Sequence, residues 1–326
     1  MQRFDPIDQR LLDEFQRDLP LIPRPFAELG AVLGLTEAEA ICRLARLQAA
    51  GSIARVGATV RPNTAGASTL AALAVPEARI DEVAALVGRE AGVNHSYLRE
   101  HDWNLWFVAT APDAAGLAAS LARIAAATGL RVLDLPLVRA FNIDLGFRLN
   151  GGRVALGPRP APDLDALRDG DRPILQAMAQ GLALVPRPFA ALADRLGRAE
   201  GEVLSRLAAL LAAGIVTRIG VIVRHRAIGW RANAMVVWDV PEGGLPAVGL
   251  ALAAQPGVTL CYQRRIVPGV WHHGLFSMIH ARTRAQALAV LAEARARPEL
   301  AGVPYQALFS TRCFKQTGAL VHSEAA

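Results

Sequence analysis

Histidine, arginine and tyrosine concentrate in two short stretches of this 326-residue chain. The first stretch is Gly92-Val-Asn-His-Ser-Tyr-Leu-Arg-Glu-His-Asp-Trp-Asn-Leu-Trp-Phe107. The second is Gly257-Val-Thr-Leu-Cys-Tyr-Gln-Arg, followed after a short loop by Trp271-His-His-Gly-Leu-Phe-Ser-Met-Ile-His-Ala-Arg282. In each stretch apolar and polar residues alternate on both sides of a turn, which predicts a β-hairpin. Five of the seven histidines lie here, more than a hairpin needs to fold, so we predict the functional site here.

The first hairpin carries groups suited to proton delivery and to carboxylate binding. Imidazole has an ordinary pKa of ~6.5 and can donate a proton at neutral pH, which makes His95 and His101 the candidate catalytic acids. Guanidinium binds carboxylates in bidentate fashion, and the recurring Tyr-x-Arg element places Arg99 and Arg264 at equivalent positions. His95 aligns with Leu260, so the fold does not require histidine there. A structural histidine and a surface arginine are the alternative interpretations.

The second hairpin adds residues that could bind a flat, anionic molecule. Adjacent His272 and His273 point to opposite faces of a regular strand, so at most one of them faces a pocket. Aromatic rings on both hairpins would form its apolar walls. The predicted binding residues are Tyr97, Trp103, Tyr262, Arg264, Arg265, His272, His273 and His280.

Composition narrows the class of protein. A hydrophobic fraction of 52% allows sizeable cores. The net charge of +6 comes almost wholly from arginine, which indicates either a polyanionic partner or a codon usage that favours arginine over lysine. Three cysteines stand singly, which argues against a disulfide framework or a zinc site. Because we find neither a signal segment nor an apolar run of ~20 residues, we expect a cytoplasmic protein without a membrane span.

The chain is a tandem duplication. Leu21-Ile-Pro-Arg-Pro-Phe-Ala27 returns as Leu184-Val-Pro-Arg-Pro-Phe-Ala190, and Ala50-Gly-Ser-Ile-Ala-Arg-Val-Gly57 returns as Ala213-Gly-Ile-Val-Thr-Arg-Ile-Gly220. We predict a winged helix-turn-helix over residues 1–62, a ferredoxin-like domain over 63–148, a linker over 149–163, and second copies of the two domains over 164–226 and 227–326.

Helical spacing over Asp5–Asp18 and Pro25–Leu33, and a capping box at Thr36 that starts a third helix, predict the helix-turn-helix. Residues 53–56 and 58–61, turning near Gly57, would form the wing. The order strand, helix, strand, strand, helix, strand that follows is typical of a ferredoxin-like α+β domain. Its uncovered sheet face must be buried, and the second copy is the expected partner. We predict a pseudo-twofold pair of sheets with a crevice between them.

A winged helix followed by a ferredoxin-like domain resembles the Lrp/AsnC family of regulators. The two hairpins, together with the two Ile/Val-Pro-Arg-Pro-Phe segments, are more specifically similar to the sirohaem decarboxylases of the type in which two subunits are fused. This resemblance covers nearly the whole chain. One departure is Trp271-His-His-Gly-Leu275, where the family more often has Trp-Pro-Tyr-Asn-Leu. The roles of His272 and His273 therefore do not follow from the resemblance.

The resemblance implies removal of carbon dioxide from the C12 and C18 acetates of sirohaem, giving 12,18-didecarboxysirohaem. Arginines would hold the remaining carboxylates, and a histidine would be the proton donor. No cofactor is expected, because the iron is part of the substrate, and His272 or His273 is the candidate axial ligand to that iron. Enzymes of the haem d1 pathway are expected handover partners. The two repeats would pair within the chain, and a homodimer of whole chains is left open.

Two other classes of function stay open on the sequence. One is a DNA-binding regulator of the Lrp/AsnC type. Both candidate recognition helices, which begin Thr36-Glu-Ala-Glu and Arg198-Ala-Glu-Gly-Glu, place glutamates where phosphate would approach, so we do not expect DNA binding. The other class is a haem-binding sensor without turnover.

Overall fold

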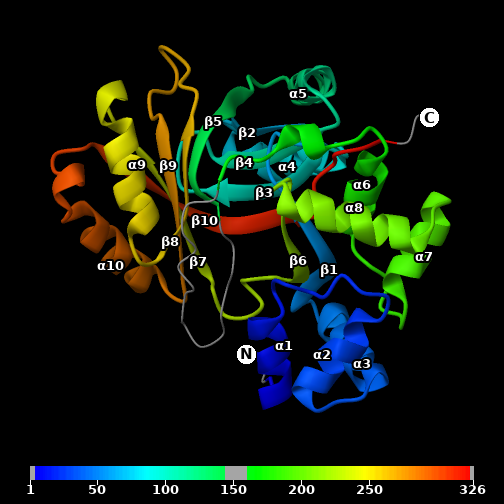
Figure 1. Ribbon diagram of the computed structural model, residues 1–326. Helices are drawn as coiled ribbons and strands as arrows, with labels where there is room; N and C mark the ends of the chain where they lie inside the picture. The colour runs from blue at the N-terminus through cyan, green and yellow to red at the C-terminus, as the bar shows by residue number, and fades with distance from the viewer. Residues whose placement is uncertain (1–3, 144–159, 324–326) are drawn as a thin grey trace.

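The computed structural model describes residues 4–143 and 160–323 and contains two copies of a helix-turn-helix module followed by a ferredoxin-like unit (Figure 1). Asp5 caps the first helix, and the predicted capping box between Thr36 and Glu39 is present at the third. Gly34 ends the second helix in the left-handed conformation, as C-cap glycines do. The helices of the two modules are α1 (Pro6–Glu14), α2 (Pro25–Leu33), α3 (Glu37–Ala49), α6 (Asp171–Gln180), α7 (Pro188–Leu196) and α8 (Glu200–Ala212).

The repeated Pro-Arg-Pro-Phe motif leads into the second helix of each module. Its second proline begins the helix, and Phe26 is fully buried beneath it. Arg24 forms an ion pair with Glu37 at the start of α3, and Arg187 repeats that pair with Glu200. The glutamates of the predicted recognition helices are therefore bound within their own modules.

The predicted wing is wrong. Residues 53–61 do not turn at Gly57 but form one strand, β1 (Ile53–Val60), which pairs antiparallel with β6 (Val216–Val223) of the other copy. Gly57 lies opposite Gly220 in that ribbon. A Cβ on Gly57 would lie 2.3 Å from the carbonyl oxygen of Met178 in α6. Glycine is therefore needed for the close approach of the two copies rather than for a turn.

We expect Gly57→Val to lower the free energy of unfolding by about 1–3 kcal/mol, because the added side chain overpacks the contact between β1 and α6. Chemical denaturation of purified variants measures the change. The control is Gly88→Ala, where a Cβ has no heavy atom within 4 Å and where a helix gains stability from alanine. Equal stability of the two variants would contradict this role for Gly57.

Each ferredoxin-like unit has the predicted order of elements. The first contains β2 (Ala67–Leu73), α4 (Ile80–Arg89), β3 (Val93–Arg99), β4 (Leu105–Ala111), α5 (Ala114–Thr128) and β5 (Leu133–Ile143). The second contains β7 (Ala232–Trp238), α9 (Leu245–Ala254), β8 (Val258–Arg264), β9 (Leu275–Ala281), α10 (Arg284–Arg295) and β10 (Tyr305–Gln316). Short 3-10 helices are η1 (Glu77–Arg79), η2 (Leu164–Ala166), η3 (Glu242–Gly244) and η4 (Pro298–Leu300).

The two sheets join edge to edge into a closed barrel with the strand order β10-β3-β4-β2-β5-β8-β9-β7. Each copy's last strand is long enough to pair with its own sheet and then with the hairpin of the other copy, β5 with β8 and β10 with β3. Closure removes free sheet edges. Figure 1 shows α9 and α10 on one side of the barrel and α4 and α5 on the other. The predicted pairing of the repeats is therefore confirmed, as a barrel.

The barrel interior is packed rather than open. Trp106, Phe276, Met278, Val237 and Leu308 form one buried cluster there, contributed by both copies. The predicted crevice between facing sheets is therefore filled by side chains. Further apolar clusters lie between each sheet and its own helices and around the β1–β6 ribbon.

Most of the predicted linker lies outside the described residues, and the domain boundaries stay predictions. In the part of the chain that the structure describes, no helix has the length and apolar character required to span a bilayer.

Candidate functional site

Both Tyr-x-Arg elements face the interior of the barrel. Tyr97 is paired with Trp106, and Tyr262 with Phe276, whose rings belong to the interior cluster. Arg99 donates through Nη1 to the carbonyl oxygen of Leu308 at 3.0 Å. Arg264 donates in the same way to the carbonyl oxygen of Leu135 at 2.7 Å. Each arginine thus reaches the last strand of the other copy.

Arg99 is buried and Arg264 is partly buried, and neither charge has a neutralising carboxylate partner among the described residues. Among the described residues neither has an acidic side chain within ion-pair distance, and the Nε of each has no hydrogen-bond partner. Burial lowers the pKa of Arg99 to about 10 and also lowers that of Arg264. A buried, unpaired cation is costly, several kcal/mol in general. Such groups suit a site that receives an anion.

One chain of hydrogen bonds fixes the orientation of Arg99. Its Nη1 donates to Asn233 Oδ1 at 3.0 Å, so the amide nitrogen of Asn233 donates to His280 Nε2 at 2.7 Å. His280 Nδ1 then carries the proton and donates to Thr259 Oγ1 at 2.7 Å, and the Thr259 hydroxyl donates to the carbonyl oxygen of Met278. His280 is therefore held neutral, as a support for Arg99, because its acceptor nitrogen faces an amide donor.

His95 lies on β3 next to the Tyr97 ring, with ring centroids 6.4 Å apart. Burial, reinforced by the positive charge of Arg55, lowers the pKa of His95 to about 4. The imidazole is therefore neutral at pH 7 in the free protein.

A cavity of about 440 Å³ lies where the barrel meets the helix-turn-helix modules, and two of its lining residues are neighbours of His95. Gln316, which lines this cavity, is the register partner of His95, and Arg55, which also lines it, is the charge that acts on the imidazole. The volume is within the usual range for small-molecule sites. The lining includes two arginines and no carboxylate: Ala54, Arg55, Ala91, Gln176, Gln180, Arg224, Gln316, Thr317, Gly318, Ala319 and Leu320.

His225, which the sequence analysis did not select as a site residue, is a neighbour of His280 and His95. It follows β6 directly, and its ring lies 4.9 Å from that of His280, centroid to centroid. Burial, together with the charge of Arg226 and the nearby His95, lowers its pKa to about 4. The available signal was the spacing: Arg224-His-Arg226 immediately follows a strand whose equivalent in the first copy leads to Arg61-Pro62.

The other predicted histidines lie around the hairpin loops. His101 Nδ1 accepts from the Trp103 backbone N–H, and its Nε2 bonds to Gln306 Oε1, both at 2.9 Å. The ring of His101 also lies 5.5 Å from that of Trp271, whereas the register partner of His95, Gln316, lines the cavity. The structure therefore does not bring His95 and His101 together at one cavity.

The prediction that His272 and His273 point to opposite faces of a strand is wrong, because both residues lie in the loop before β9 and their rings stack with centroids 4.2 Å apart. His272 is 67% exposed and lies 3.7 Å from Asp239, while His273 is buried against Trp271. Burial, with the neighbouring His272, lowers the pKa of His273 to about 4. Arg265 is exposed beyond the end of β8. The roles predicted for these residues stay predictions.

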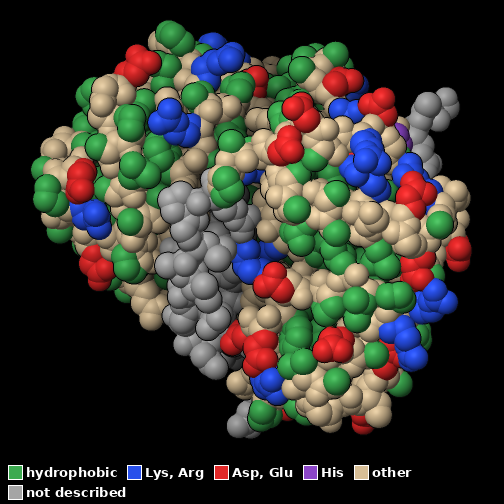
Figure 2. All heavy atoms as spheres, in the orientation of Figure 1, with side chains coloured by type: hydrophobic (Ala, Val, Ile, Leu, Met, Phe, Trp, Pro, Cys, Tyr) green, Lys and Arg blue, Asp and Glu red, His purple; other side chains and the backbone are tan. Residues whose placement is uncertain are grey.

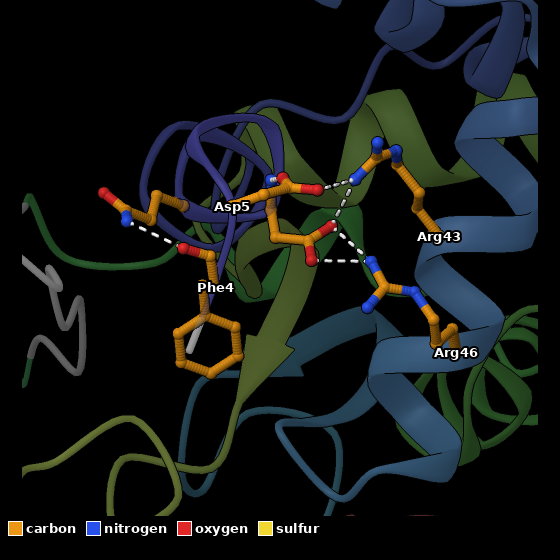
Figure 3. A network of polar contacts seen from close by, with 6 residues as sticks. Phe4, Asp5, Arg43 and Arg46 are labelled. Carbon is orange, nitrogen blue, oxygen red and sulfur yellow. Dashed lines mark hydrogen bonds and ion pairs between the residues drawn. The ribbon is translucent and has the colours of Figure 1, made fainter. Parts of the chain in front are cut away.

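The basic side chains of the first candidate recognition helix are bound within the module. Arg43 contacts Asp5 at 2.7 Å and Asp8 at 2.9 Å, and Arg46 contacts Asp8 at 2.6 Å (Figure 3). Acidic and basic side chains are interspersed over the face that Figure 2 shows, where they form no continuous basic patch. These arginines are therefore already paired with carboxylates instead of being presented to phosphates.

Family models match both halves of the chain. Residues 8–53 and 171–216 match "Siroheme decarboxylase NirDL-like HTH domain", and residues 65–142 and 227–315 match "AsnC-like ligand binding domain".

Several proteins with known roles are similar to the chain. It is 66% identical over 323 residues to the siroheme decarboxylase NirDL subunit of Paracoccus denitrificans, covering 99% of both chains. It is 33% identical to the siroheme decarboxylase of Hydrogenobacter thermophilus, covering 97% of this chain and 95% of that one. The NirD subunit of Pseudomonas aeruginosa is 51% identical over 149 residues, which are 46% of this chain and 99% of that subunit.

Two crystal structures of the siroheme decarboxylase NirDL also align with the chain at 28% sequence identity. One has a TM-score of 0.69 and covers 97% of this chain and 94% of that one. The other is a co-complex with an iron-uroporphyrin III analogue, with a TM-score of 0.67 and coverage of 96% and 92%.

Proposed function

The chain belongs to the siroheme decarboxylase NirDL family, whose members are carboxy-lyases, and from this premise we propose that it removes the C12 and C18 acetate carboxyl groups of sirohaem as carbon dioxide. The product is 12,18-didecarboxysirohaem. One observation of the site supports this assignment most: a cavity lined by two arginines and no carboxylate contains Gln316 and Arg55, both neighbours of the half-buried imidazole of His95. On the same strand as His95, the buried guanidinium of Arg99 has no carboxylate partner among the described residues.

The reaction breaks one carbon–carbon bond and forms one carbon–hydrogen bond at each acetate. When the carboxylate leaves as carbon dioxide, its electron pair stays on the methylene carbon and is delocalised into the macrocycle. A proton then converts the methylene to a methyl group. The protein must hold the other carboxylates, exclude water and deliver that proton.

Arginines from three elements perform the first task. Arg55 and Arg224 line the cavity, and Arg99, on the same strand as His95, is held by Asn233 so that its remaining N–H groups point in a fixed direction. Burial lowers the pKa of Arg55 as well, so an arriving carboxylate would relieve an existing cost at two of these sites. The iron of the macrocycle is part of the substrate, and we propose no additional cofactor.

His95 delivers the proton. At pH 7 the free protein holds it neutral, since its pKa is about 4. Substrate carboxylates beside Arg55 oppose the charge that depresses this pKa, so binding favours the imidazolium. The imidazolium then donates its proton to the methylene carbon and is refilled from solvent.

We therefore expect sirohaem binding to be accompanied by uptake of about one proton through His95 at pH 6–7. In the free protein the pKa of His95 is about 4, so the imidazole is unprotonated at pH 6–7. If binding raises this pKa, the imidazole takes a proton from solvent. A pH indicator in weakly buffered anaerobic solution measures the uptake. His95→Leu should remove it, and an unchanged uptake in that variant would assign the proton to another group.

Anaerobic incubation of the protein with sirohaem, followed by mass analysis of the pigment, tests the function. Loss of two carbon dioxide units supports the proposal. A tightly bound but unaltered pigment would identify a haem-binding sensor or carrier instead. Salt-sensitive retention on DNA without turnover would identify a regulator.

A further inference from the structure

A smaller cavity lies at the corner of the second copy where β7 begins, β9 ends and α10 begins. It has a volume of about 220 Å³ and shares no lining residue with the cavity of about 440 Å³. Among the described residues that line it, three are arginines, Arg231, Arg282 and Arg284, and one is acidic, Glu100. The lining therefore carries more positive than negative charge.

The carboxylate of Glu100 is already bound. It accepts from Arg284 Nη1 at 2.7 Å and from Nη2 at 2.8 Å, and the Arg284 guanidinium also lies 3.9 Å from the ring centre of Phe309. Glu100 follows β3 of the first copy and Arg284 begins α10 of the second, so this pair joins the two copies. It fixes one arginine of the corner and leaves the excess positive charge of the lining in place.

Arg282 is held in position by its neighbours. Its guanidinium lies 5.7 Å from the ring centre of Trp230, and a Cβ on Gly229 would lie 3.1 Å from its Nη1. Gly229 has a φ of +101°, a conformation that side chains disfavour, so glycine suits this close approach. Because the half-buried Arg282 is already ordered, it loses little conformational freedom when it binds an anion.

A two-residue insertion builds this corner in the second copy alone. In the first copy Gly66 directly precedes β2, whereas Trp230 and Arg231 stand between Gly229 and β7. One inserted residue supports Arg282, and the other lines the cavity. The first copy forms the same strand without them, so the fold of the unit does not require the insertion.

The corresponding corner of the first copy has neither the charges nor the space. Strands β4 and β9 end at equivalent alanines, so Arg282 and Arg284 correspond to Pro112 and Ala114. A Cβ on Gly66 would lie 2.4 Å from the last carbonyl oxygen of β4. Direct packing therefore fills the place where the second copy has arginines.

The start of α10 also suits a bound anion. Arg284 is the first residue of this 12-residue helix, whose first turn contains no acidic residue. The equivalent helix α5 is capped by the carboxylate of Asp113, whereas α10 is capped by the hydroxyl of Thr283. The N-terminal end of a helix favours anions and disfavours cations. An arginine in place of an acid there is therefore suited to an external anion rather than to the helix itself.

We propose that this corner, the arginine corner formed by Arg231, Arg282, Arg284 and Glu100, is a binding site for one oxyanion, a carboxylate or a phosphate group. Arg231 and Arg282 bind it, and the Arg284–Glu100 pair forms one wall. The volume of about 220 Å³ is below the ~300–1,000 Å³ of sites for drug-sized ligands, so the corner takes a single anionic group rather than a macrocycle.

Two further lining residues connect the arginine corner to the candidate functional site. Asn233 accepts from Arg99 Nη1 at 3.0 Å, and the carbonyl oxygen of Ser310 accepts from Arg226 Nη2 at 3.2 Å. The oxyanion has two potential sources, a free anion from solution and a carboxylate arm of the bound pigment. The second source rests on the proposed function.

Calorimetric titration of the full chain with inorganic phosphate and with acetate tests the proposal. Ionic strength is held constant with chloride. The corner variants are Arg282→Met and Arg231→Ala. The matched control is Arg131→Met, which removes an exposed arginine of the first copy and so reports the effect of net charge alone.

We expect Arg282→Met to weaken phosphate binding about 10–100-fold, the usual loss for a hydrogen bond to a charged group. Arg231→Ala should weaken it by a smaller factor, because Arg231 is more exposed, and Arg131→Met should leave it within about twofold. Arg231→Ala carries the test if circular dichroism shows that Arg282→Met misfolds. A parent protein that binds neither phosphate nor acetate, or corner variants that bind phosphate as tightly as the parent, would overturn the proposal.

Titration with sirohaem at several phosphate concentrations identifies the source of the oxyanion. If a carboxylate of the pigment occupies the corner, the apparent Kd of sirohaem rises in proportion to phosphate in the parent but not in Arg282→Met. If a free anion occupies it, this proportional rise is absent, and the oxyanion site itself stands in both cases. A parent protein that binds phosphate at the corner yet removes no carbon dioxide from sirohaem would overturn the proposed function alone.

Discussion

His95→Ala is expected to lower the rate constant of decarboxylation about 10²–10⁴-fold, the usual contribution of a positioned general acid. The affinity for sirohaem should change little, because the arginines that hold its carboxylates are left intact. Stopped-flow binding and single-turnover mass analysis under anaerobic conditions separate these two quantities. A loss in binding with an unchanged rate constant would contradict the assignment.

Two further measurements distinguish proton donation from a merely structural role of His95. Added imidazole should restore part of the activity of His95→Ala, because a free imidazolium can occupy the space beside the cavity. The matched control, Leu260→Ala, creates a comparable space at the equivalent position and should show no such response. Absence of rescue, together with a lowered unfolding midpoint, would indicate that His95 only supports the barrel.

Asp171→Ala is expected to lower the free energy of unfolding by about 3–5 kcal/mol, because it leaves a buried charge without its partner. The carboxylate of Asp171 accepts from Arg206 Nε at 2.9 Å and from Nη2 at 2.7 Å, and its side chain is only 1% exposed. Denaturant unfolding followed by circular dichroism measures the change. The exposed pair of Arg198 and Glu202 offers the control, since Glu202→Ala should cost only about 0.3–0.5 kcal/mol.

The same pair predicts sensitivity to acid. Burial acts to raise the pKa of Asp171, but hydrogen bonds from Arg206 and from the Arg168 N–H outweigh it and hold the pKa below its usual value. A carboxyl whose folded-state pKa is lowered stabilises the protein above its unfolded-state pKa. This stability is lost as the pH falls through the folded-state pKa. A double variant, Asp171→Leu with Arg206→Met, should lose less stability than Asp171→Ala alone, because no unpaired charge is left.

Local sequence signals determined the elements of each copy. The capping box at Thr36 and the glycine after α2 predicted where helices begin and end, because caps act over only a few residues. The internal repeat predicted two copies of each module, and the hairpin residues predicted the family, which the comparisons confirm.

Contacts between the copies required the tertiary structure. The sequence of β1, two short apolar runs separated by Gly57, is typical of a hairpin. The strand instead pairs with β6, because Gly57 lets it pass close to α6. The barrel closes because β5 and β10 extend past their own sheets and pair with the hairpin of the other copy. The alternation of apolar and polar residues within a strand does not indicate such pairing. Pairing between segments far apart in sequence is decided by packing, which a local pattern does not contain.

The sequence by itself determined which groups could do the chemistry, because imidazole and guanidinium are identified by residue type. It did not determine which of them share one place. Only the tertiary structure separates His95, whose register partner Gln316 lines a cationic cavity, from His101, whose two ring nitrogens are bonded at a hairpin loop. Only the structure brings His225 to His280, since these residues lie on segments that meet through barrel closure and module packing.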